Sequence, residues 1–471
     1  MTQIKIPDLG DFDEVEVVEV HVKSGQSIKE NDPIITLETE KAAMDVPSIV
    51  TGEVISIDVK SGDKVSEGDV IAEISVDTLI EPETEDQQDE KSSNSEAEYD
   101  LAVIGAGPGG YAAAFRASDL GLKVALIDRN PVLGGVCLNV GCIPSKAFLH
   151  AAKVIEDSNE ASKAGIHFKD LKIDLEKMKD WKDGIIDGLT SGLKNLAKQR
   201  QVDCYQGDAS FISNQQLQIS SADNKQQITF KYAIIAVGSE PASLDFMPND
   251  SRVIDSTGAL DPESIPKKIL IIGGGIIGLE MATIYSALGS RVTVVELMEE
   301  LMTGTDKDLV KPLERYLSER CEDIYKSTKV ISAQALDEGI SVTFENDGAE
   351  QTETFDKVLV AIGRTANGKL IHVDRARVEV SNEGTINVDR QMRTNVENIF
   401  AIGDVIGDPM LAHKVSYEGK IAAEVVPGKK SEMEARCIPS FDYQVPEIAW
   451  GGLTETDCKK DKKETKKGLF P

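Results

Sequence analysis

Long apolar runs and an excess of basic charge are both absent from this chain of 471 residues. No stretch reaches the roughly 18 apolar residues of a membrane-spanning helix. The first residues show neither the basic and apolar regions of a secretory signal nor the arginine-rich pattern of a transit peptide. With 81 acidic and 51 basic side chains, the formal net charge is −30, which repels nucleic acids and anionic lipids. We therefore expect a cytoplasmic protein with no nucleic-acid partner and no membrane span.

Cysteine is also scarce, and a reducing cytoplasm makes stable structural disulfides improbable. The six cysteines are Cys137, Cys142, Cys204, Cys321, Cys437 and Cys458. Cys137 and Cys142 form the one close pair. An iron–sulfur site of matching spacing needs a third cysteine where Ser145 stands, and the other cysteines supply no second close pair for a zinc site. We expect no metal, and the pair is predicted to exchange electrons.

The close pair lies in residues 134–146, which read Gly-Gly-Val-Cys-Leu-Asn-Val-Gly-Cys-Ile-Pro-Ser-Lys. An apolar helical pattern follows at 147–155. Cys142 is expected just before the helix start, where the helix dipole and unpaired amides stabilise a thiolate. Cys137 is expected on the glycine-rich approach, open to attack.

An internal repeat occupies the first part of the chain. Residues 16–38 align with residues 53–75 at a constant offset of 37, including a shared Val-Lys-Ser-Gly. Both halves alternate apolar and polar residues between turns, which predicts short strands in a small sandwich or flattened barrel. The sequence Glu-Thr-Glu-Lys-Ala-Ala-Met-Asp at 38–45 lies between the halves, so we expect a hairpin turn there with Lys41 near its tip.

This module resembles a lipoyl domain, whose Glu-Thr-Glu-Lys-Ala turn carries the modified lysine. The resemblance implies a lipoyl group attached covalently to Lys41; the alternative is an ordinary surface lysine. Residues 77–98 then hold nine acidic residues and one lysine, the composition of a flexible, disordered linker.

A dinucleotide-binding pattern begins at residue 99. A buried strand leads into Gly105, Gly107 and Gly110, a helical pattern follows, and a second strand ends at Asp128. The glycines permit a tight turn and close approach of a pyrophosphate to the helix N-terminus, and the carboxylate receives ribose hydroxyls.

The same pattern recurs at 268–297, with Gly273, Gly275 and Gly278 before the helix and Glu296 after the second strand. A carboxylate at this position favours NAD over NADP, although Arg291 nearby weakens the argument. Two such patterns suggest two dinucleotides, one of them a flavin, because nicotinamide and thiol chemistry need an intermediary.

Three further apolar runs end in glycine, at 232–238, 358–363 and 399–403. They fit strands that deliver loops to a cofactor crevice. Asp404, directly after the last run, is a candidate to bond a polyol or ribityl chain; an ordinary turn aspartate is the alternative.

With the Cys-Leu-Asn-Val-Gly-Cys-Ile-Pro-Ser-Lys sequence, the chain resembles the pyridine nucleotide–disulfide oxidoreductases, and within them the dihydrolipoamide dehydrogenases of 2-oxo-acid dehydrogenase complexes. The resemblance implies a homodimer that moves electrons from dihydrolipoamide through a Cys137–Cys142 disulfide and FAD to NAD⁺. Cys137 would be the interchange thiol and Cys142 the charge-transfer thiol. The implied FAD residues are Gly105, Gly107, Gly110, Asp128, Lys146, Ala209, Asp404 and Ala412. The implied NAD residues are Gly273, Gly274, Gly275, Gly278, Glu296, Ala361, Gly363 and Arg364.

Some positions depart from the family pattern. Val136 and Val237 each replace a usual Thr, Asp128 a usual Glu and Ala366 a usual Pro. The family also uses a His-Pro pair with a downstream Glu as the acid–base dyad, and none of the five histidines here precedes a proline. We expect a turnover of dihydrolipoamide lowered by roughly 10²- to 10⁴-fold, the usual contribution of a general base.

The expected fold is multidomain: an all-β lipoyl domain, then α/β Rossmann-like domains and the start of an α+β interface domain. We expect a lipoyl domain at 1–76, the linker at 77–98, an FAD-binding domain at 99–245, an NAD-binding domain at 246–370, a central FAD-contacting segment at 371–436 and the truncated start of a dimerisation domain at 437–471. The alternatives are a disulfide reductase of the mercuric or glutathione type, and an inactive lipoyl-bearing interaction module.

Overall fold

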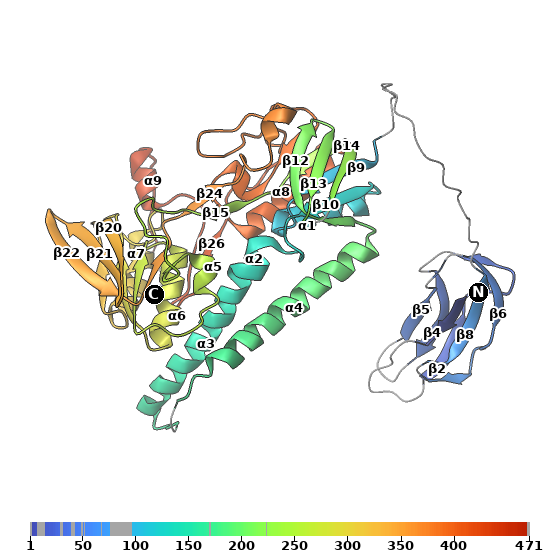
Figure 1. Cartoon of the computed structure of the whole chain (residues 1–471), viewed down its shortest axis with the longest axis horizontal. Coiled ribbons are helices and arrows are strands. Elements are labelled where there is room, and N and C mark those ends of the chain that lie inside the picture. Colours follow the sequence, from blue (N-terminus) through green and yellow to red (C-terminus); the bar gives the residue numbers. More distant parts are fainter. Residues whose placement is uncertain are drawn as a thin grey trace. The chain divides into compact units, whose positions relative to one another are not determined.

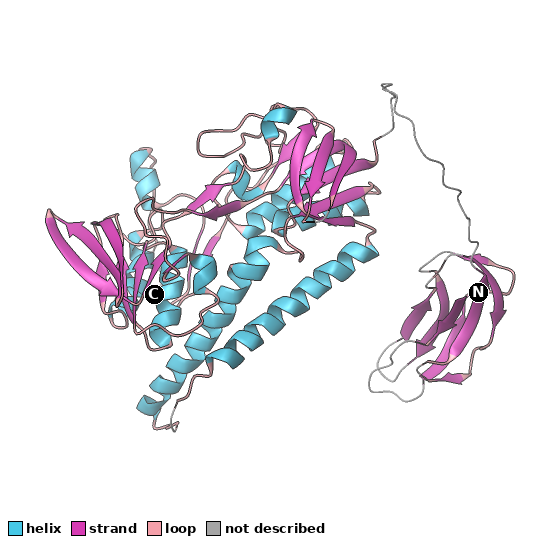
Figure 2. Cartoon of the chain, viewed as in Figure 1, coloured by secondary structure: helices cyan, strands magenta, loops and turns pink. Residues whose placement is uncertain are grey.

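The computed structural model describes residues 2–6, 15–28, 32–38, 43–48, 50, 52–66, 68–75, 97–168, 171–222 and 224–468. The chain divides into two compact units, Met1–Asn94 and Ser95–Pro471, and Figures 1 and 2 show their elements. Within these residues, no helix combines the length and the apolar character needed to cross a membrane.

The first unit consists of two four-stranded sheets, with the strand orders β1-β8-β6-β3 and β5-β4-β2-β7. The strands are β1 (Thr2–Lys5), β2 (Val15–Val20), β3 (Ser27–Ile28), β4 (Pro33–Glu38), β5 (Ala43–Pro47), β6 (Gly52–Ile57), β7 (Lys64–Val65) and β8 (Val70–Ser75). The sequence repeat is visible in these bounds, because β2, β3 and β4 recur 37 residues later as β6, β7 and β8. Alternate Val, Ile and Leu side chains from both sheets fill the core between them. The predicted sandwich is confirmed.

The predicted hairpin lies between β4 and β5. These two strands pair antiparallel, and Glu38 is opposite Ala43 at the end of the ladder. Lys41 itself lies outside the described residues, as does most of the predicted linker at 77–98.

Within the described residues, the second unit contains a mixed, mostly parallel sheet and an all-parallel sheet. In the first, β11 (Asp203–Gln206), β10 (Val124–Asp128), β9 (Tyr99–Ile104), β14 (Lys225–Ile235) and β25 (Ile399–Ala401) are parallel neighbours in that order. The antiparallel strands β12 (Asp208–Ser213) and β13 (Gln216–Ser220) extend β14. Helices α1 (Pro108–Asp119) and α8 (Ala412–Val425) share one core with this sheet.

The second sheet is all parallel, with the order β16-β23-β17-β18-β19. Its strands are β16 (Val253–Ile254), β23 (Lys357–Val360), β17 (Lys268–Ile272), β18 (Arg291–Val295) and β19 (Asp323–Tyr325). Helices α5 (Ser256–Ala259), α6 (Ile276–Ala287) and α7 (Lys307–Ser318) contribute to the core on one side. An antiparallel meander of β20 (Thr328–Leu336), β21 (Gly339–Asn346) and β22 (Ala349–Phe355) contributes to a second core cluster with the sheet.

Several elements of the second unit connect its two large sheets. The antiparallel pair β15 (Ser239–Pro241) and β24 (Arg364–Ala366) bridges them. Helix α2 (Gly135–Val140) leads into the long α3 (Cys142–Glu160), which runs beside α4 (Leu175–Gln199) in Figure 1. The hairpin of β26 (Ser440–Asp442) and β27 (Ile448–Trp450) packs through Ile448 into the core that contains α3 and α6, and α9 (Glu455–Lys460) follows.

Candidate active site

The first dinucleotide motif forms a cradle at the end of β9. Gly105 has φ +102°, and a Cβ there would lie 2.2 Å from the Ala236 carbonyl oxygen, so a larger residue does not fit. The Ala106 N–H donates to Asp128 Oδ2 at 2.6 Å. The carboxylate that ends the second strand therefore braces the glycine loop.

The second motif repeats this geometry at the end of β17. Gly273 has φ +113°, and a Cβ there would lie 2.3 Å from the Ala361 carbonyl oxygen. The Gly274 N–H donates to Glu296 Oε2 at 2.6 Å. In both cradles the acid follows the braced amide by 22 residues.

The third glycine of each motif serves packing. A Cβ on Gly110 would lie 1.7 Å from the Gly105 carbonyl oxygen, and one on Gly278 would lie 2.0 Å from that of Gly273. Both therefore let a helix begin close against its strand, and both lie away from the cavity lining described below.

Two 12-residue helices, α1 and α6, begin at these loops, and no side chain of the described residues caps either N-terminus. Their first N–H groups thus keep their capacity to bind an anion. The uncapped helix ends, the glycines of positive φ and the two bracing carboxylates fit the pyrophosphate and ribose groups of two dinucleotides.

A continuous cavity of about 1330 Å³ connects the two cradles. All the expected cofactor residues except Gly110 and Gly278 line it, as do both cysteines of the close pair. The volume exceeds the roughly 300–1,000 Å³ of a pocket for one small molecule, as two neighbouring cofactors require.

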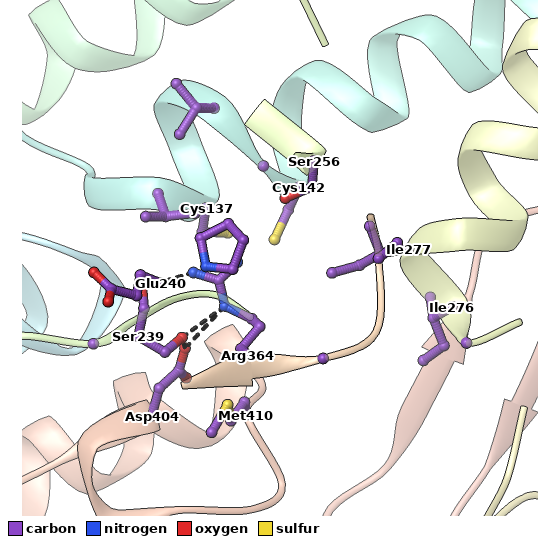
Figure 3. Close-up of a pocket in the computed structure, with 18 of the residues that line it drawn as sticks. Cys137, Cys142, Ser239, Glu240, Ser256, Ile276, Ile277, Arg364, Asp404 and Met410 are labelled. Carbon is purple, nitrogen blue, oxygen red and sulfur yellow. Dashed lines mark hydrogen bonds and ion pairs between the residues drawn. The ribbon is translucent and has the colours of Figure 1, made fainter. Parts of the chain in front are cut away.

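Both cysteine sulfurs point into this cavity (Figure 3). Cys142 is the first residue of α3, at a helix N-terminus as predicted. Cys137, on the glycine-rich approach, lies inside the short helix α2. Asn139 Nδ2 donates to the carbonyls of Leu133 and Gly135 at 3.1 and 3.0 Å. These two hydrogen bonds, together with the positive φ of Gly134 and Gly135 at the start of α2, stabilise this helix. The glycine-rich sequence alone does not favour it.

The two thiols are electrostatically unequal. A hydrogen bond from Cys137 and the nearby charge of Lys146 lower the pKa of Cys142 to about 7. The same hydrogen bond, together with burial, raises the pKa of Cys137 far above its ordinary value. In the dithiol state above about pH 7, Cys142 is therefore the thiolate and Cys137 keeps its proton.

Lys146 lies one turn into α3 and is held by Glu280, which lies on the helix of the second dinucleotide motif. Its Nζ lies 2.6 Å from Glu280 Oε1 on α6 and 5.0 Å from the centre of the Tyr443 ring. Glu280 is almost fully buried, so this ion pair fixes the position of the cation beside Cys142.

A second polar group borders the cavity near β15 and β24. Ser239 Oγ donates to Asp404 Oδ2, and Arg364 Nε donates to Ser239 Oγ at 2.6 Å, as the dashed lines in Figure 3 show. Asp404 follows β25, and the buried Glu418 accepts the Gly403 N–H at 2.9 Å. Asp404 is thus held at the cavity wall by contacts on both sides.

Sequence reasoning did not identify Glu280, Glu418, Ser239 or Tyr443. Glu280 lies two residues after Gly278, the last glycine of the second motif, in an otherwise apolar helix segment, and a charged residue in such a segment is the one signal that would have found it. The other three have no comparable local signal.

Residues 99–419 match the family described as "Pyridine nucleotide-disulphide oxidoreductase". The chain belongs to this family. Residues 2–74 match a second family, the biotin and lipoyl attachment domains described as "Biotin-requiring enzyme", which implies a lipoyl group on a lysine.

Curated members of the oxidoreductase family are close relatives of this chain. Proteins named dihydrolipoyl dehydrogenase from Vibrio cholerae and Haemophilus influenzae are each 47% identical over 380 residues, which is 80% of this chain and 80% and 79% of theirs. One from Bacillus subtilis is 40% identical over 375 residues, 79% of this chain and 80% of its own.

Among solved structures, the HOCl-induced flavoprotein disulfide reductase RclA of Escherichia coli, as a Cu(II) complex, aligns with a TM-score of 0.69. The alignment covers 78% of this chain and 80% of that one at 24% identity, which shows the shared fold. The family is one of flavoproteins that use FAD and a pyridine nucleotide, so the predicted multidomain fold and the cofactors FAD, NAD and lipoyl are confirmed at the family level.

Proposed function

We propose that this oxidoreductase transfers two electrons from dihydrolipoamide through the Cys137–Cys142 disulfide and FAD to NAD⁺. The observation that carries the proposal is that the unequal thiol pair lines the same cavity as the two dinucleotide cradles. The names of the relatives supply the substrate.

The protein side of the reaction follows from the two thiols. A thiolate of dihydrolipoamide attacks Cys137 of the disulfide, and Cys142 leaves as a thiolate because its pKa is the lower one. The second substrate thiol displaces Cys137, which gives lipoamide, a Cys137 thiol and a Cys142 thiolate. Lys146 and the N-terminus of α3 stabilise that negative charge. FAD supplies a carrier that accepts the two electrons and passes them on as hydride.

We assign the first cradle to FAD and the second to NAD⁺. Gly105, Gly107, Asp128, Ala209, Asp404 and Ala412 would contact FAD directly, with Lys146 beside its ring and Gly110 shaping the loop. Gly273, Gly274, Gly275, Glu296, Ala361, Gly363 and Arg364 would line the NAD path, with Gly278 shaping its loop. The cysteine pair lies on α2 and α3, and Gly135 of α2 lies close against Gly107 of the first cradle, which supports this order.

The second cradle favours NAD⁺ over NADP⁺. Glu296 accepts N–H groups from Gly274 and Met298 at 2.6 and 2.7 Å, so its charge points at the position of a ribose. Arg291 starts β18 and pairs with Glu322 at 3.1 Å. Five residues of strand, roughly 16 Å, separate it from Glu296, so it is badly placed for a 2′-phosphate.

We also propose domain boundaries at residues 76, 98, 245, 370 and 436. Strand β15 lies at the end of the proposed FAD-binding domain, 99–245, and β24 lies within the proposed NAD-binding domain, 246–370. The boundary at 245 therefore falls just after β15, the first strand of the pair that bridges the two sheets. The segment 371–436 returns to the first sheet through β25, which supports its assignment as a central FAD-contacting part.

We further propose that the first unit carries lipoyl on Lys41, and that the chain serves a 2-oxo-acid dehydrogenase complex as a homodimer in the cytoplasm. The match over residues 2–74 and the antiparallel β4 and β5 on either side of the lysine support the attachment. Exposed apolar side chains on α3 and α4, such as Val154, Trp181 and Leu189, support the proposed contact with a second subunit. Sedimentation of the purified chain measures its oligomeric state.

The test is NADH formation from dihydrolipoamide and NAD⁺ by the purified, FAD-loaded chain. We expect activity that Cys142→Ser abolishes. Cys204→Ser, which changes an exposed cysteine outside the cavity, is the matched control and should retain the wild-type rate. Loss of activity in both variants, or in neither, would contradict the assignment.

The same assay measures the predicted loss of roughly 10²- to 10⁴-fold against an enzyme with a general base. Glutathione disulfide with NADPH tests the rival reductase class, and faster turnover of that pair would replace dihydrolipoamide as the substrate.

A further inference from the structure

Ser239 is a buried serine in the cavity wall, at a point where three distant segments of the chain meet. It lies in β15 and is 5% exposed, and its hydroxyl contacts Arg364 of β24 and Asp404, which follows β25. All three residues line the cavity, and Figure 3 shows their side chains converging. Ser239 and Asp404 are 165 residues apart, so the fold, and not the local sequence, brings them together.

The direction of each hydrogen bond in this group is fixed by chemistry. A guanidinium can only donate, so Arg364 Nε donates to Ser239 Oγ at 2.6 Å. Arg364 Nη2 also donates to the Ser239 carbonyl oxygen at 2.7 Å, which holds the guanidinium in place. The serine hydroxyl has a single hydrogen, and an ionised carboxylate only accepts, so this hydrogen goes to Asp404 Oδ2. Arg364 thus orients the hydroxyl toward Asp404.

Asp404 keeps one carboxylate oxygen for a ligand. Its Oδ2 accepts from Ser239, whereas no group of the described residues donates a hydrogen bond to its Oδ1. The Asp404 side chain is 23% exposed and lines the cavity. A carboxylate oxygen is an acceptor, so the ligand group that fits it is a donor, such as a hydroxyl of a polyol chain.

The backbone around Asp404 is held by contacts that do not involve Ser239. The Gly403 N–H donates to Glu418 Oε2 at 2.9 Å, and the Gly407 N–H donates to the Asp404 carbonyl oxygen at 3.0 Å. Neither contact fixes the side-chain torsion angles of Asp404. Within the described part of the chain, the Ser239 hydroxyl is the hydrogen-bond donor that sets the direction of this carboxylate.

Ser239 also keeps Arg364 and Asp404 apart. Arg364 Nε lies 3.9 Å from Asp404 Oδ2, which is too long for a hydrogen bond, and both atoms contact the serine oxygen instead. Without that oxygen the two charged groups can pair directly, because a guanidinium binds both oxygens of a carboxylate in parallel. Such a pair would occupy the oxygen that is left for a ligand.

We propose that Ser239 is a positioning residue for FAD, which directs Asp404 Oδ1 toward the ribityl hydroxyls and prevents Arg364 from capturing the carboxylate. Ser239 acts through Asp404 in this role and does not itself contact the ribityl chain. The inference rests on the proposed assignment of Asp404 to FAD, and the experiments below distinguish a failure of that assignment from a failure of the inference.

The test is the dissociation constant of FAD, measured by flavin fluorescence when the 471-residue chain, freed of flavin, is titrated with FAD. We expect Ser239→Ala to weaken binding by about tenfold, the usual contribution of one hydrogen bond to a charged group.

Thr365→Val is the matched control. It removes a hydroxyl from the same pair of strands, but Thr365 is exposed and does not line the cavity, so the variant should bind FAD like wild type. Wild-type affinity in Ser239→Ala overturns the proposal, as does an equal loss of affinity in Thr365→Val.

A double-mutant cycle separates positioning from a general effect on structure. If Ser239 acts through Asp404, adding Ser239→Ala to Asp404→Ala should weaken FAD binding by less than about twofold. A further loss as large as that in the wild-type background overturns the inference while leaving the assignment of Asp404 intact. An unchanged FAD affinity in Asp404→Ala alone contradicts that assignment, and the inference with it.

Ser239→Thr covers the case in which Ser239→Ala binds no FAD. Threonine keeps the hydroxyl and suits a strand position, so we expect an affinity close to that of wild type. Loss of FAD binding in this variant as well shows that the hydroxyl is not what matters and overturns the proposal.

Discussion

Replacement of Glu296 by Gln tests whether one carboxylate selects the nicotinamide cofactor. The change keeps the shape of the side chain and removes its charge. Two unit charges 4 Å apart interact by about 4 kcal/mol at an effective dielectric constant of 20. Glu296 is half-buried, so solvent screening lowers the repulsion of a 2′-phosphate to about 2 kcal/mol, or roughly 30-fold in the preference for NADH over NADPH.

Glutamine offers one oxygen where Glu296 uses two, for the N–H groups of Gly274 and Met298. One of these amides loses its acceptor, at a cost of about 1 kcal/mol. We therefore expect the kcat/KM for NADH to fall several-fold while the ratio of NADPH to NADH rises by roughly 30-fold.

The assay is oxidation of NADH or NADPH with ferricyanide as the electron acceptor, which does not need the disulfide step. Arg291→Met is the matched control, because Arg291 pairs with Glu322 at the opposite end of β18. It should leave the cofactor ratio unchanged. A ratio that moves in the Arg291 variant, or stays constant in Glu296→Gln, refutes the reasoning.

Three further predictions concern packing, the thiolate and the support of Asp404. Gly278→Ala should lower the free energy of unfolding by about 1–3 kcal/mol, since its Cβ would lie 2.0 Å from a backbone oxygen. Gly275→Ala, with no described atom within 4 Å of its Cβ, should leave stability nearly unchanged, and similar losses in denaturant unfolding would contradict the packing argument. Because the pKa of Cys142 is lowered from 9.0 to about 7, the thiolate–flavin absorbance of the reduced protein should be present above about pH 7 and lost below it. Lys146→Met should move that midpoint upward, and a fixed midpoint would exclude the lysine as its cause. Glu418→Gln leaves the buried Lys414 3.0 Å from a neutral group, so we expect the free energy of unfolding to fall by about 3 kcal/mol. We also expect the variant to retain less FAD, measured by its absorbance. Full FAD retention would show that Glu418 does not support the FAD site.

The sequence predicted the features that depend on local spacing. The 37-residue offset predicted the paired strands of the first unit, because period-two alternation records which face of a strand is buried. The glycines at 105 and 273 predicted both cradles, since each needs a positive φ and the absence of a Cβ.

Contacts between distant segments were not predictable in this way. Lys146 and Glu280 are 134 residues apart, and neither position alone indicates the other. Asp442 lies between two aromatic residues in a short polar segment, which gives no sign that its side chain is buried. These groups acquire their charge states from packing between α3, α6 and β26, and packing is what a single sequence leaves open.

The strand pairing of the first unit has a consequence for how that unit can be divided. The short strand of each half pairs with the other half: β3 with β6, and β7 with β2. The halves are thus interlocked rather than stacked, and neither can satisfy its own hydrogen bonds when isolated. A fragment containing one copy of the repeat should remain unfolded, whereas two separately expressed copies should complement each other and restore the sandwich.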